Sequence, residues 1–166
     1  MSNGYTHTNT TLLAATGIFI VGCYLSAKPP DETKLIYTAC ITLGCITGIL
    51  LSPDLDIEKG SISMAHVRNF TGNAGGIFST LWLWYWWPYA KAIPHRHFLS
   101  HFPVVSTIIR MIYLFILPII ILFIMFLQIE NGLEIYKTII FNLYVVFVFL
   151  GLCVSDTLHA IMDWLL

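Results

Sequence analysis

The chain has 166 residues, of which 57% are hydrophobic and only 10% are charged, and its formal net charge is −1. A soluble domain carries about 25% charged residues, so this composition argues against a water-covered surface and favours one that faces lipid. The weak net charge provides no basic field, so nucleic acid is not an expected partner.

Four runs of about 18–20 residues contain neither charged nor histidine side chains, which is close to the length of helix that crosses a bilayer core. With their flanking turns, they predict transmembrane helices at about 8–27, 35–53, 107–129 and 138–160. The sequence therefore predicts an all-α fold, an integral membrane four-helix bundle that forms a single domain over residues 1–166.

A fifth uncharged stretch, 69–90, differs from these runs. It begins with a glycine-rich segment at 71–76 that disfavours helix, and its apolar part, 77–90, is rich in Trp and Tyr. Aromatic rings with a polar atom favour the headgroup level of a bilayer. We expect an interfacial or re-entrant segment between helices two and three. The alternative is a packed aromatic core segment, which would leave the topology unchanged.

Four spans place both termini and the long central loop on one face. That face receives every histidine of the chain, whereas the charged side chains in the loops of the opposite face are carboxylates and lysines. Ionisable groups gathered at one side of a membrane protein indicate a functional site. The positive-inside rule favours the cytoplasm for this face, and we expect a bacterial inner-membrane protein. The histidines are His7, His66, His95, His97, His101 and His159.

Two candidate ligand clusters lie in the central part of the chain. Asp54 and Asp56 follow Pro53, and in extended chain they would point the same way and clamp a cation; a solvated loop that caps the helix is the alternative. The second cluster, at 95–101, holds three imidazoles, and imidazole is the commonest metal ligand. We favour a metal-binding or catalytic use for it.

The fourth predicted helix ends with Asp156, His159 and Asp163, whose spacing places all three on one stripe. A carboxylate in these apolar surroundings requires a partner. That partner is either a metal ion or a side chain such as Arg110. The lone His7 gains interest only because the topology delivers it to the same face.

These segments resemble a family of small bacterial membrane-embedded metal-binding proteins, which is similar to the LexA-regulated membrane-bound metal-dependent hydrolases. The resemblance rests on SNGYTH at 2–7, LSPDLD at 51–56, WWPYAKAIPHRHFLSHFP at 86–103 and H-x-x-x-D-W at 159–164. It implies a distant likeness to zinc-dependent phospholipase C enzymes, and it gives no role to His66, His97 or Asp156. The metal ligands it implies are His7, Asp54, Asp56, His95, His101, His159 and Asp163.

Seven mixed imidazole and carboxylate ligands exceed one tetrahedral site and suit two divalent ions about 3.5–4 Å apart. Ligands without thiolate favour zinc, with manganese or iron as alternatives. Asp54 or Asp163 would bridge the ions or accept a proton, and Arg96, Lys91 or Arg110 would hold an anionic group.

Two functions of different classes follow. The first is a membrane-embedded metal-dependent hydrolase that acts on a phosphoester or lipid-like substrate at the bilayer interface. The second is a non-catalytic protein whose structural metal serves partner binding or membrane perturbation. A metal transporter is less well supported because the middles of the predicted helices lack polar ligands. The sequence gives no support for an oligomer.

The topology is testable by single-cysteine labelling in a background without the four native cysteines. Asn3→Cys and Ile57→Cys should both react with an impermeant maleimide from the same side of the membrane, because an even number of spans separates them. Labelling from opposite sides would overturn the gathering of ligands on one face.

Overall fold

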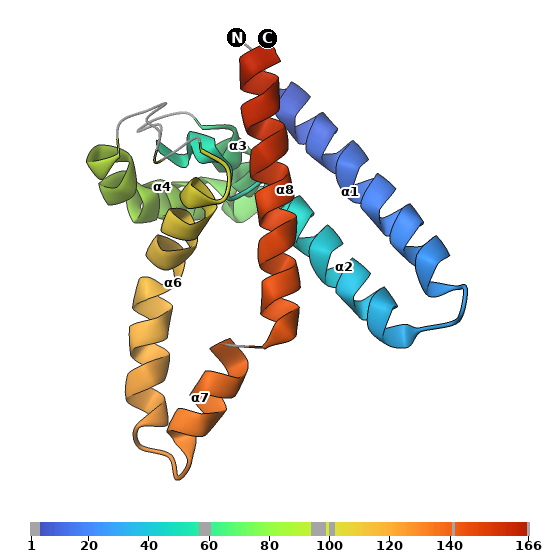
Figure 1. Ribbon diagram of the computed structural model, residues 1–166. Helices are drawn as coiled ribbons and strands as arrows, with labels where there is room; N and C mark the ends of the chain where they lie inside the picture. The colour runs from blue at the N-terminus through green and yellow to red at the C-terminus, as the bar shows by residue number, and fades with distance from the viewer. Residues whose placement is uncertain (1–3, 57–60, 94–98, 100–101, 141, 166) are drawn as a thin grey trace.

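The computed structural model describes residues 4–56, 61–93, 99, 102–140 and 142–165 (Figure 1). Within these ranges the chain is helical and contains no strand, which confirms the all-α prediction. The long helices are α1 (Gly4–Ser26), α2 (Glu32–Thr47), α4 (Gly75–Ala92), α6 (Val105–Phe126) and α8 (Leu143–Leu165). The shorter ones are α3 (Ile62–Phe70), α7 (Gly132–Ile140) and the 3-10 turns η1 (Pro53–Asp56) and η2 (Gly72–Ala74).

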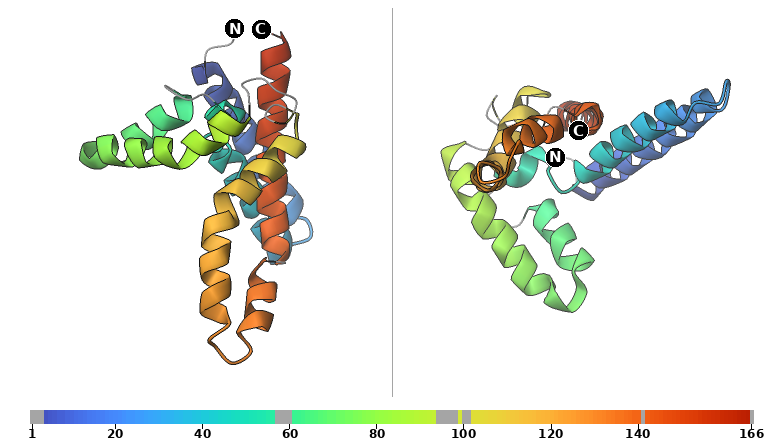
Figure 2. Two further views of the ribbon diagram at one scale, coloured as in Figure 1. Left: turned by 90° about the vertical axis from the view of Figure 1, so that its left-hand side faces the viewer. Right: turned by 90° about the horizontal axis from the view of Figure 1, so that it is seen from below.

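The helices form two hairpins around α8. In Figure 1, α1 and α2 make one hairpin, α6 and α7 make the other, and α8 runs between them toward the end where both termini lie. The two hairpin turns lie at the opposite end. Both views in which α8 stands upright show α3 and α4 projecting sideways across its direction (Figure 2).

Two helices of the described residues are long and apolar enough to cross a membrane, namely α1 over Tyr5–Ser26 and α8 over Leu143–Leu165, with mean hydropathies of 1.4 and 2.0. The α2 helix is shorter, with 16 residues. Much of α1 is open to its surroundings; for example, Leu13 is 75% exposed and Ile20 is 62% exposed. A broad apolar surface of this kind requires a covering phase or partner.

The helix boundaries depart from the predicted spans for local reasons. The α2 helix begins after Asp31, whose carboxylate accepts hydrogen bonds from the amides of Thr33 and Lys34, and these bonds hold the pKa of Asp31 below its usual value. The helix ends at Thr47 rather than at 53, and three turn residues precede the Pro53 segment. The predicted 138–160 helix is wrong in its limits, because α7 ends at Ile140 and α8 runs from Leu143 to Leu165. Asn142 accepts a hydrogen bond from the amide of Tyr144 at 2.9 Å, which caps the new start.

Glycines allow α2 and α8 to pack with their backbones in contact. A Cβ atom on Gly44 would lie 2.0 Å from the carbonyl oxygen of Val148, and one on Gly151 would lie 2.0 Å from that of Ile41. Small residues at such crossings are typical of helices that associate in membranes. The crossing brings the C-terminal half of α8 beside the end of α2.

The aromatic segment forms α4, and its two faces differ. Trp86 and Tyr89 are each 2% exposed and pack with Tyr113 of α6. The opposite face is open, with Trp84 72% exposed. The segment is therefore a helix with an aromatic core face, as the alternative reading expected. Its position at a bilayer interface stays a prediction.

Gly151→Ala should destabilise the chain by about 1–3 kcal/mol, because the added methyl group meets backbone atoms that cannot move without separating α2 from α8. Gly17→Ala is the matched control, since no atom lies within 4 Å of its added Cβ, and it should be neutral or slightly stabilising. Thermal unfolding in detergent, followed by circular dichroism, measures both. Equal midpoints for the two variants would contradict the close crossing.

Candidate metal centre

Three side chains from the two ends of the chain meet in one cluster. Ligand atoms of His7, His159 and Asp163 all lie within 4.8 Å of one another. The Nε2 atom of His7 is 3.3 Å from Asp163 Oδ1, and the Nε2 atom of His159 is 3.3 Å from Asp163 Oδ2. The two imidazole rings stack with their centroids 3.9 Å apart. A fourth group, Asp54 of η1, places Oδ1 3.6 Å from His159 Nε2.

The fold explains this convergence. His159 and Asp163 are four residues apart on α8 and therefore share one face of the helix. The first turn of α1 brings His7 against that face, near the end where both termini lie (Figure 1). The close crossing of α2 and α8 then delivers η1, with Asp54, to the same place.

The donor set fits a divalent transition metal. Zinc binds nitrogen and oxygen ligands at about 2.0–2.1 Å in tetrahedral geometry, which separates neighbouring donor atoms by about 3.3 Å. The two nitrogen–oxygen distances of 3.3 Å match that separation. His7 and His159 are buried, and two imidazolium ions stacked at 3.9 Å would repel each other strongly. A neutral imidazole ring can donate a lone pair to a cation, which the two carboxylates would attract.

A small cavity adjoins this cluster, with a volume of ≈ 20 Å³. A cavity of that size holds about one water molecule. The buried Ser52 hydroxyl lines it and has no hydrogen-bond partner among the described residues. A buried polar atom without a hydrogen-bond partner indicates room for a bound water or ligand atom. The full lining is His7, Thr8, Thr11, Gly48, Ile49, Ser52, Asp54, Ile62, Ser155 and His159.

The structure thus brings together four of the seven ligands that the sequence implies: His7, Asp54, His159 and Asp163. Asp56 is the last residue of η1, and its side chain lies outside the described part of the chain. His95, Arg96, His97 and His101 also lie outside the described residues, so their roles stay predictions. The Lys91 amino group lies 4.6 Å from the centre of the Trp87 ring at the end of α4.

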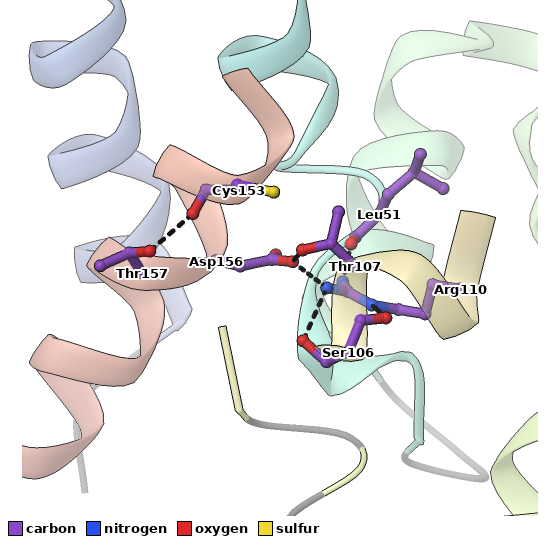
Figure 3. A network of polar contacts seen from close by, with 7 residues as sticks. All are labelled: Leu51, Ser106, Thr107, Arg110, Cys153, Asp156 and Thr157. Atoms are coloured by element: carbon purple, nitrogen blue, oxygen red, sulfur yellow. Dashed lines mark hydrogen bonds and ion pairs between the residues drawn. The ribbon is translucent and has the colours of Figure 1, made fainter. Parts of the chain in front are cut away.

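Asp156 has the partner that the sequence offered as the alternative to a metal. Its carboxylate pairs with Arg110, and both side chains are 2% exposed (Figure 3). The Thr107 hydroxyl donates to the same carboxylate oxygen, and Arg110 also donates to the carbonyl oxygen of Leu51 and, at 3.3 Å, to that of Ser106. The guanidinium is therefore buried and committed to this network, and the expectation that Arg110 holds an anionic substrate group stays a prediction.

This network joins elements that carry ligands. Leu51 lies three residues before Asp54, and Asp156 lies three residues before His159.

Sequence reasoning missed Ser106, Thr107 and the Leu51 carbonyl. The signal that could have indicated Ser106 and Thr107 is their position: they are polar residues about one turn before an arginine in an apolar helix. It also missed Thr8, whose hydroxyl lies 3.0 Å from His66 Nε2.

Arg110→Met should cost about 3–5 kcal/mol, because it leaves the Asp156 carboxylate buried without its charge partner. Arg110→Met combined with Asp156→Leu should recover much of that loss, since the apolar pair removes both desolvated charges. Lys137→Met is the control; it breaks an exposed pair with Glu134 and should change stability by at most about 0.5 kcal/mol. Denaturant unfolding in detergent measures all three. An Arg110→Met variant as stable as Lys137→Met would contradict the structural importance of the Arg110–Asp156 pair.

Comparison with known proteins agrees with the donor set. No curated protein and no solved structure matches the chain. A family model described as "Uncharacterized metal-binding protein (DUF2227)" matches residues 2–166, which is nearly the whole chain. The match confirms a metal-binding family, whereas the similarity to LexA-regulated membrane hydrolases stays an expectation. The chain therefore belongs to the uncharacterized metal-binding protein family DUF2227.

Proposed function

We propose that this chain is a membrane-embedded, metal-dependent hydrolase that cleaves a phosphoester at the bilayer interface. The observation that carries the proposal is the cluster of His7, His159, Asp163 and Asp54, with its donor atoms at metal-ligand separations beside a polar cavity. A neutral imidazole and carboxylate set without thiolate is typical of hydrolytic zinc, manganese or iron sites. The larger ligand set that the sequence implies favours two ions.

The membrane setting rests on composition and shape. α1 and α8 are long and apolar enough to cross a bilayer, and α6 contributes a shorter described apolar segment, Val105–Ile116. We propose that α1, α2, α6 and α8 form the membrane bundle of a bacterial inner-membrane protein, with the site end at the cytoplasmic surface. The sideways direction of α3 and α4 suits helices that lie along that surface (Figure 2).

The chain's own residues would perform three tasks. His7, Asp54, His159 and Asp163 would hold the ions, which would lower the pKa of a water molecule and so supply the nucleophile. Asp54, at the edge of the cluster, accepts the proton that this water loses, and Arg96 binds the phosphoryl oxygens. The water oxygen forms a new bond to phosphorus while the bond to the leaving alcohol oxygen breaks. The proton then passes from Asp54 to that oxygen, which regenerates the carboxylate.

One observation favours the second candidate, a structural metal site. The cavity of ≈ 20 Å³ holds about one water molecule, so it offers no space for a whole substrate. In that case the metal would join α1 to α8 and stabilise the bundle. The two functions differ in what happens when a ligand is removed.

Asp54→Ala, His101→Ala and Asp163→Ala should each lower phosphodiester hydrolysis by at least about 100-fold, because ligands of one metal centre act as a unit. Metal content, measured by elemental analysis, should fall in the same variants, and a chelator should inactivate the wild-type protein reversibly. Glu134→Ala, which removes an exposed carboxylate on α7, is the control and should keep both metal and turnover.

All rates are normalised to folded, detergent-extracted protein. The structural alternative predicts that the three variants lose folded protein before any other property. Folded variants without metal that hydrolyse at the wild-type rate would reject the catalytic site. A wild-type protein that holds metal and hydrolyses no phosphoester would favour the structural role.

A further inference from the structure

An open apolar groove lies between the second half of α2 and the outer part of α3, with a volume of ≈ 530 Å³. Ligand pockets commonly measure about 300–1,000 Å³, so the groove is large enough for a small molecule. None of its lining residues is Asp, Glu, Lys or Arg. They are Leu43, Ile46, Thr47, Ile49, Leu50, His66, Asn69 and Phe70.

Hydrogen bonds hold the start of α3 against the segment that follows α2. The Ser63 hydroxyl of α3 donates to the carbonyl oxygen of Leu50, and the indole N–H of Trp82 donates to the Ser63 hydroxyl at 3.0 Å. These bonds fix the start of α3 to the end of α2. The outer walls remain open, since Phe70 is 91% exposed and Leu43 is 59% exposed.

The groove adjoins the metal centre. Ile49 lines both the groove and the small cavity beside His7, Asp54 and His159. A second connection is the contact between Thr8, which lines the cavity, and His66, which lines the groove. A molecule lying in the groove would therefore have one end a single side chain away from the metal ligands.

We propose that this groove binds the hydrocarbon chain of an amphiphilic phosphoester, whose polar head reaches the metal centre past Ile49. The inference rests on the proposed function and names its substrate class. An apolar groove that shares the Ile49 side chain with a cavity lined by His7, Asp54 and His159 matches a molecule with one apolar and one polar end. An apolar partner helix in the groove would leave the His and Asp side chains beside Ile49 without a matching polar group.

A direct test uses a phosphodiester that carries a photoactivatable diazirine at the end of a hexadecyl chain, with the protein in phosphatidylcholine nanodiscs. Photoproducts should concentrate on the peptides of α2 and α3 that line the groove. Ile46→Trp fills the groove and should lower labelling there by about tenfold, the loss expected when a bound group is displaced. Ile36→Trp is the matched control, because Ile36 lies on the same helix at 46% exposure, against 43% for Ile46, and outside the groove.

A second test compares hydrolysis of the p-nitrophenyl diesters of hexadecyl phosphate and of methyl phosphate. Ile46→Trp should lower the ratio of long-chain to short-chain kcat/KM by at least about tenfold, whereas Ile36→Trp should leave the ratio unchanged. Leu43→Phe provides a smaller obstruction on the same wall and should give a partial effect.

The outcomes separate the two proposals. Equal labelling and equal ratios for Ile46→Trp and Ile36→Trp, in a protein that hydrolyses both diesters, would overturn the groove and leave the hydrolase standing. Labelling spread evenly over exposed faces such as that of Ile20 on α1 would overturn the groove by itself. Labelling confined to the groove, without turnover of either diester, would support the binding site and overturn the hydrolase.

Discussion

The buried ion pair between Arg110 and Asp156 is the interaction on which the arrangement of the site depends. Two charges with 2% exposed side chains are costly to remove from water, and a single contact rarely offsets that cost. Here the Thr107 hydroxyl supports the carboxylate, while the carbonyl oxygens of Leu51 and Ser106 accept from the guanidinium. The pair therefore joins α6, α8 and the end of α2 in one network. Asp54 of η1 and His159 of α8 each lie three residues along the chain from a member of this network, Leu51 and Asp156 respectively.

Close packing and polar contacts both position the residues of the candidate metal centre. The glycine crossing of α2 and α8 sets the distance between the two helices, because their backbones already touch at Gly44 and Gly151. Arg110 of α6 pairs with Asp156 of α8 and donates to the carbonyl oxygen of Leu51, so it ties α6 to α8 and to the segment after α2. The first turn of α1 then completes the cluster by stacking His7 on His159. The three histidines that the structure describes, His7, His66 and His159, all contact α1 or α8 in this region.

The metal centre and the apolar groove have opposite chemistries but share a wall. On one side of Ile49 are imidazoles, carboxylates and the Ser52 hydroxyl, and on the other are Leu43, Ile46 and Phe70. This juxtaposition comes from the direction of α3, which starts at the end of α2 and then runs away from it.

The sequence was enough to predict the helical class and to bring His7, Asp54, His159 and Asp163 forward as candidate ligands. Uncharged runs of bilayer length allow few other structures, and His159 and Asp163 at four-residue spacing share a helix face in any fold. Tertiary structure alone decided that Asp156 pairs with Arg110, that Thr8 contacts His66, and that a groove opens between α2 and α3. It also decided that α7 and α8 are separate helices, although Asn142 offered a local signal. The physical reason is that hydrophobic periodicity specifies which residues avoid water but not which helices cross, in what register, or which distant polar groups satisfy each other.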